Sequence, residues 1–109
     1  MYKNVVNERT IKMANQLYGG LDETKFRSMA KKAVVDYWND NKKLVEKFGE
    51  ISTKKVYVVW QVKVIQNSKA ILGVKVEDDG MYFEFTYNGD AKEAYLDVYK
   101  KQTKRIVKY

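Results

Sequence analysis

Residues 56–65 read Val-Tyr-Val-Val-Trp-Gln-Val-Lys-Val-Ile, and their side chains alternate with a period of two. This alternation is typical of a half-buried β-strand. One face of the strand is expected to carry Val56, Val58, Trp60, Val62 and Val64, and the other Tyr57, Val59, Gln61, Lys63 and Ile65. The first face is entirely apolar and the second is mixed, which predicts a sheet that is covered on one side only.

Two more strands are predicted after this one. Residues 66–69 form a turn, and a second strand over residues 70–77 places Leu72, Val74 and Val76 on one face. Asp78-Asp79-Gly80 is a hairpin signal that leads into a third strand over residues 81–87. Gly73 lies inside the second strand, where a glycine marks a bulge or the close approach of another side chain.

Helical spacing is found on both sides of the predicted strands. A short helix is expected after Asn7 up to Gly19, and a longer one from the N-cap Asp22 to Gly49, interrupted at the weak helix formers of residues 39–41. Asp90 and Glu93 match a variant of the capping box, which predicts a last helix over about residues 91–106. The expected order of elements is ααβββα.

These elements predict a single α+β domain over residues 1–109, because no Pro/Gly/Ser-rich linker divides the chain. The domain is expected to be a three-stranded antiparallel meander with its helices packed on one face. Residues 1–20 form an N-terminal helical extension in this interpretation.

The composition of the 109-residue chain excludes most catalytic chemistry. The chain has no Cys and no His, so disulfides, thiolate nucleophiles, His-containing triads and zinc sites built on these residues are absent. We therefore expect a protein that is not an enzyme and that has no catalytic residues, metal or cofactor. No segment reaches the length of a membrane span, which predicts a cytoplasmic protein without membrane contact.

One enzymatic alternative rests on the carboxylates Asp78, Asp79 and Glu84, because clustered carboxylates can hold Mg²⁺ for phosphodiester cleavage. A hairpin explains the same pattern better. Asp-Gly supplies the positive φ that a tight turn needs, and acidic side chains at an exposed tip remain solvated.

Positive charge is concentrated at the C-terminus. The chain has 21 Lys and Arg against 14 Asp and Glu, a net charge of +7. Residues 99–109 contain no acid and five cations, namely Lys100, Lys101, Lys104, Arg105 and Lys108. On a helix these cations form a ridge that suits contact with DNA, RNA or another polyanion. Cations in a last helical turn are also favoured by the helix dipole, so a purely structural role remains open.

The mixed face of the predicted sheet is the second candidate site. It suits a protein interface, including contact between two copies of the chain, better than it suits a phosphate track. Its expected members are Tyr57, Val59, Lys63, Ile65, Ile71, Lys75, Tyr82 and Glu84.

Residues 30–39, 58–60, 66–70, 79–82, 86–90 and 95–101 together resemble a family of small proteins from phages and prophages of Gram-positive bacteria, a domain of unknown function. The resemblance covers about residues 26–101. The first 20 residues and the segment beyond Lys101 look like departures from the family.

The resemblance implies a setting in the cytoplasm of a bacterial host. Small phage proteins without catalytic residues act by stoichiometric binding, which implies a partner that is a host or phage protein complex. One expectation is an inhibitor of a bacterial defence system such as a CRISPR effector. The alternative is a basic nucleic-acid-binding accessory protein for phage replication or transcription. Fold-level analogy does not choose between them.

Overall fold

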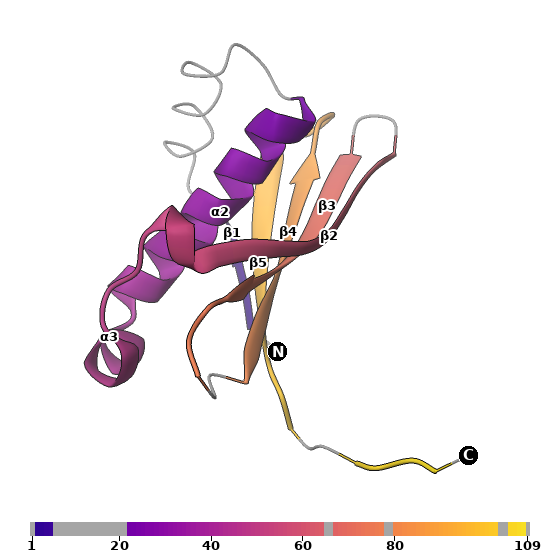
Figure 1. The fold of residues 1–109 in the computed structure, drawn as a ribbon. Helices are drawn as coiled ribbons and strands as arrows, with labels where there is room; N and C mark the ends of the chain where they lie inside the picture. The colour runs from indigo at the N-terminus through magenta and orange to yellow at the C-terminus, as the bar shows by residue number, and fades with distance from the viewer. Residues whose placement is uncertain (1, 6–21, 65–66, 78–79, 103–104, 109) are drawn as a thin grey trace.

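The computed structural model describes residues 2–5, 22–64, 67–77, 80–102 and 105–108, and Figure 1 shows their arrangement. The described part contains five strands, two α-helices and one 3₁₀ turn. In chain order these are β1 (Tyr2–Val5), α2 (Glu23–Asp40), α3 (Lys42–Phe48), η1 (Thr53–Lys55), β2 (Val56–Val64), β3 (Asn67–Val74), β4 (Met81–Asn88) and β5 (Glu93–Lys100).

The strands form one antiparallel sheet in the order β1-β5-β4-β3-β2. The α+β class and the meander from β2 to β4 are confirmed, but three strands were expected and the sheet has five. The additional strands are β1 and β5. The predicted helix after Asn7 lies outside the described residues, and within the expected N-terminal extension residues 2–5 are a strand paired with β5.

The long helix begins and pauses where the sequence predicts. The Asp22 side chain accepts a hydrogen bond from the Lys25 amide at 2.9 Å, and this bond lowers the pKa of the Asp22 carboxyl. Asn41 is both the C-cap of α2 and the N-cap of α3, where its side chain accepts from the Leu44 amide. The polar residues 39–41 therefore divide the helical region in two.

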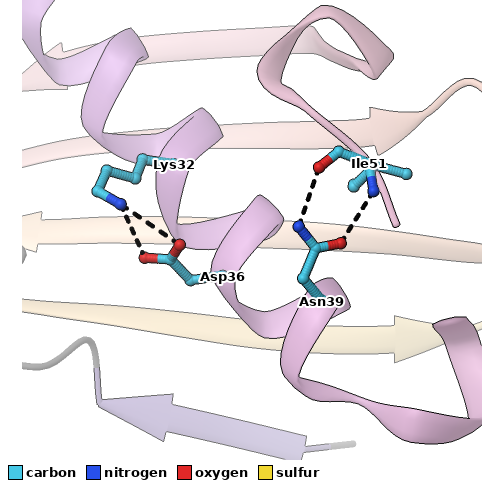
Figure 2. Close-up of polar contacts among 4 residues, drawn as sticks. All are labelled: Lys32, Asp36, Asn39 and Ile51. Carbon is cyan, nitrogen blue, oxygen red and sulfur yellow. Dashed lines mark hydrogen bonds and ion pairs between the residues drawn. The ribbon is translucent and has the colours of Figure 1, made fainter. Parts of the chain in front are cut away.

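Two side chains of α2 hold the segment that leads to the sheet. The Asn39 amide donates to the Ile51 carbonyl oxygen and accepts from the Ile51 N–H, both at 2.9 Å (Figure 2). One residue earlier, the Trp38 indole N–H donates to the Gly49 carbonyl oxygen at 3.1 Å. These bonds fix where the chain leaves α3 and enters β2.

Figure 1 shows α2 on one side of the sheet, and the buried side chains of the core fill the space between them. Phe26 of α2 packs on Phe85 of β4 with ring centroids 5.6 Å apart, and Tyr37 meets the edge of Phe83 at 6.0 Å. From β5 the core receives Ala94, Leu96 and Val98. The sheet thus has one covered face, as the alternation in the sequence predicts.

The prediction of a final helix is wrong, because residues 93–100 form β5 and pair with β4 along the whole strand. The turn that precedes β5 uses Asn88, whose side chain accepts from the amides of Asp90 and Ala91. Lys92 adopts a positive φ of 52°, which ends this turn. Pairing with β4 buries three apolar side chains of β5 at once, and this outweighs the local capping signal at Asp90 and Glu93.

The predicted face of β2 is correct only before residue 59. The register with β3 shifts between Val58 and Trp60, so that Val58 pairs with Leu72 but Trp60 pairs with Ile71. A β-bulge of this kind inserts one residue and turns the following side chains to the opposite face. Trp60, Val62 and Val64 were expected in the core and are exposed by 49%, 38% and 60%.

Candidate functional site

The sheet face that points away from α2 is called the open face here. Within β2–β5 it consists of residues 57, 60, 62 and 64 of β2, the odd-numbered residues 67–73 of β3, the even-numbered residues 82–88 of β4 and the odd-numbered residues 93–99 of β5. Paired residues in an antiparallel sheet point to the same face. The register therefore places Trp60, Ile71, Glu84 and Asp97 in one row across four strands.

The structure brings together half of the residues predicted for this surface. Tyr57, Ile71, Tyr82 and Glu84 all lie on the open face. The other four do not join them there. Val59 is the bulged residue, Lys63 pairs with the buried Ser68 on the other face, Lys75 follows the end of β3, and Ile65 lies outside the described residues.

The sequence interpretation missed Trp60, Tyr95, Asp97 and Tyr99. Trp60 was assigned to the core because a bulge leaves no clear mark in the alternation of a valine-rich strand. The other three were assigned to a helix. Their own alternation with Ala94, Leu96 and Val98 is a period of two, and this signal for β5 was present in the sequence.

One end of the open face is aromatic. Tyr82 and Tyr99 are opposite each other on β4 and β5, and their rings stack at 4.7 Å between centroids with 4° between planes. Trp60 and Tyr57 stand on β2, where Tyr57 is 42% exposed. Large aromatic side chains left exposed together are characteristic of binding surfaces, since they bury much area at little entropic cost.

The Tyr57 ring lies directly over Gly73, its partner on β3. A Cβ atom at Gly73 would be 2.5 Å from the Cζ and hydroxyl oxygen of Tyr57. The glycine in the predicted strand therefore marks the close approach of a side chain, one of the two outcomes expected from the sequence.

Gly73→Ala should move Tyr57 off the sheet with a modest cost in the free energy of unfolding, because the clash involves the outer end of an exposed side chain. In the Tyr57→Ala background the same substitution should be neutral or stabilising, since alanine suits a strand better than glycine. A double-mutant cycle measured by urea unfolding should give a coupling energy of about 0.5–2 kcal/mol. Additive effects at the two positions would contradict the contact.

The other part of the open face forms a groove of about 510 Å³. Valine side chains from β2 line one side and polar side chains from β3, β4 and β5 line the rest; they include Val62, Val64, Lys69, Glu84, Tyr95 and Asp97. The Lys69 ammonium lies 3.4 Å from a Glu84 carboxylate oxygen. Glu84 thus has a cationic partner within the groove.

Asp97 is a buried acid in the same groove. Its residue is 8% exposed, and its Oδ1 atom is buried without a hydrogen-bond partner. A buried carboxylate oxygen left without a partner costs about 1–3 kcal/mol or more, so such an atom is rare in native structures and calls for an explanation. Asp97 is therefore the most unusual polar group among the described residues of the open face.

Within β2–β5 the open face is acidic, although the chain as a whole is basic. Across β2–β5 it carries the single cation Lys69 and the three acids Glu84, Glu93 and Asp97, which leaves a net charge of −2. Burial, Glu84 and Asp97 raise the pKa of the Tyr99 phenol. A hydrogen bond to Glu93 raises the pKa of the Tyr95 phenol. Burial is the largest cause of the shift at Tyr99, and the hydrogen bond to Glu93 is the largest cause at Tyr95.

The predicted cationic ridge is not a helical ridge. Lys100 is the last residue of β5, and Lys101 follows it with its N–H bonded to the Gly80 carbonyl oxygen. Lys104 lies outside the described residues. Arg105 and Lys108 are exposed in a segment without helix or strand that extends away from the sheet (Figure 1). The alignment of cations three and four residues apart requires a helix, so its basis is lost.

The described residues give no support to the magnesium alternative. Asp78 and Asp79 lie outside them, and Glu84 is paired with Lys69. Within the described ranges no three His, Cys, Asp or Glu side chains come together as a metal site would require. Over the same ranges, no helix is both long and apolar enough to cross a membrane.

Comparison with family models matches residues 27–109 to a family of unknown function (DUF6275). The match continues beyond Lys101 to the end of the chain, so the C-terminal segment is not a departure from the family, contrary to expectation. Comparisons with curated proteins and with solved structures give no significant match.

Proposed function

We propose that this chain, which belongs to the family of unknown function DUF6275, is a non-enzymatic protein that binds a protein partner through its open face. The observation that carries the proposal is the exposure of Trp60, Tyr57 and Tyr82 together on the sheet face opposite α2. Tryptophan and tyrosine, together with arginine, are enriched among the few residues that dominate the binding energy of protein interfaces.

A protein partner suits this face better than a nucleic acid does. Proteins that stack bases on exposed aromatic residues surround them with cations that follow the phosphate backbone. Here the aromatic residues adjoin Glu84 and Asp97, and the only cation of the face in β2–β5, Lys69, is paired with Glu84. The face would repel phosphates and attract a basic protein surface.

The partner class we propose is a host nucleoprotein complex, and the chain would inhibit it by stoichiometric binding. The bacterial host as the setting is implied by the resemblance of this sequence to phage proteins. A CRISPR effector is an example with suitable chemistry, because it holds nucleic acid in a positively charged channel. An acidic face with aromatic anchors could occupy such a channel or its rim.

The test uses the full chain with an affinity tag and two alanine variants of the same strand. Trp60 and Lys63 are both exposed on β2 but lie on opposite faces. Trp60→Ala should reduce capture of a bacterial protein complex from a host lysate at least tenfold, whereas Lys63→Ala should leave capture unchanged. Equal capture by the wild type and Trp60→Ala would refute binding through this face.

Binding of nucleic acid by the C-terminal cations is the alternative, favoured by the exposure of Arg105 and Lys108 beyond the sheet. It predicts that affinity for a DNA or RNA oligonucleotide falls steeply with salt. Neutralising Lys101, Arg105 and Lys108 would then lower the salt slope by about one unit for each lost contact. Unchanged affinity after neutralisation would exclude this alternative.

A further inference from the structure

We infer that the groove of the open face binds an arginine side chain, which a basic segment of the protein partner presents to Asp97. This inference rests on the proposed function and specifies the chemistry of the partner. Asp97 supplies the central observation, because its Oδ1 atom is buried in the groove with no hydrogen-bond donor. Because Asp97 lines the groove, rotation of its carboxylate would present this oxygen to a donor that enters the groove.

The groove has the size and the lining for a long cationic side chain. Its volume of about 510 Å³ is typical of a site for a small ligand. Val62 and Val64 form an apolar wall that can hold the methylene groups of an arginine. Asp97 and Glu84 are paired across β5 and β4 and can accept hydrogen bonds at the other end.

A metal ion or an anion fits the groove less well. The Lys69 ammonium, 3.4 Å from the Glu84 carboxylate, would repel a compact dication, and no cluster of three ligands exists among the described residues. An anion would meet three carboxylates on the same face. Because carboxylates outnumber cations on the open face within β2–β5, a ligand with a single positive charge fits the groove best.

Arginine suits this arrangement better than lysine. Its planar guanidinium carries five N–H donors in a fixed fork, so one group can donate to two separate acceptors such as Asp97 and Glu84. It also stacks on aromatic rings, and Tyr95 lines the groove in the row next to Asp97 and Glu84. An ammonium group is a compact point charge and is more strongly hydrated.

The test is a titration of the full-length, ¹⁵N-labelled protein with N-acetyl-arginine methylamide. The matched probe N-acetyl-citrulline methylamide has the same shape without the charge. The arginine probe should give saturable shifts at amides near residues 62–64, 84–86 and 95–97, and citrulline should give none. Asp97→Asn should weaken the arginine probe at least tenfold, and Glu84→Gln should weaken it less.

Three outcomes would overturn the inference: no saturable shift, equal shifts with citrulline, or unchanged affinity in Asp97→Asn. Thermal unfolding should show Asp97→Asn to be as stable as the wild type or more stable, as expected of a group kept for binding.

The titration needs no partner, so the two proposals can fail separately. Face-dependent capture without binding of the arginine probe would retain the proposed function and refute the inference. Binding of the probe without face-dependent capture would refute the proposed function and leave the groove as an arginine site.

Discussion

Trp38→Ala should lower the free energy of unfolding by about 3–5 kcal/mol, the range for removing a large aromatic side chain from a core. Trp38 is completely buried in α2, and its ring packs on Phe48 with centroids 5.5 Å apart. Its indole N–H also satisfies the Gly49 carbonyl oxygen. The substitution removes apolar contacts and leaves a carbonyl without its donor, so both costs add.

The chain contains its own control for this prediction. Trp60 is the second tryptophan and is 49% exposed on the open face. Trp60→Ala should therefore change the free energy of unfolding by about 1 kcal/mol or less. Urea unfolding followed by far-ultraviolet circular dichroism measures both variants without relying on tryptophan fluorescence. Similar losses at the two positions would show that Trp60 belongs to the core and that the bulge at Val59 is wrong.

Asn39→Ala should lower the free energy of unfolding by about 2–3 kcal/mol. The Asn39 side chain makes two hydrogen bonds of 2.9 Å with the backbone of Ile51, which is buried. Alanine would leave a partly buried N–H and a partly buried carbonyl without partners, each at a cost of about 1–3 kcal/mol. Asn39→Asp should also be destabilising, because a carboxylate accepts from the Ile51 N–H but cannot donate to the carbonyl.

Asp36→Ala is the matched control on the same helix. Asp36 and Lys32 form an ion pair at 3.3 Å, with both side chains more than 40% exposed (Figure 2). Exposed pairs with this spacing on a helix contribute about 0.3–0.5 kcal/mol. Urea unfolding should therefore separate the two contacts of Figure 2 clearly. A loss at Asp36 as large as that at Asn39 would contradict this account of the α2 contacts.

Signals from residues close together in the sequence predict only part of the fold. The caps at Asp22 and Asn41 and the buried stripe of α2 depend on residues three or four positions apart. Such interactions are visible in the sequence. The partner of Asn39 is 12 residues away, and a polar residue near a helix end is expected at the surface whether or not it has such a partner.

The candidate site was also predictable only in part, because some of its residues are placed by contacts between strands that are distant in the sequence. Tyr57, Tyr82 and Glu84 follow the alternation of their strands, and the structure confirms their common face. Trp60 departs from the alternation because Val59 is bulged. Asp97 becomes unusual only once β5 pairs with its neighbours, since a carboxylate on the predicted surface helix would have been solvated.

Local spacing and composition were enough to predict the α+β class, the long helix with its caps and the strands β2, β3 and β4. The absence of Cys and His chemistry also follows from composition. Three features became visible only in the folded protein: residues 93–100 are a strand, the C-terminal cations form no helical ridge, and Trp60 and Asp97 share one face. They depend on strand pairing and a bulge, which are set by contacts between residues far apart in the sequence, and the burial energy of these contacts outweighs local propensity.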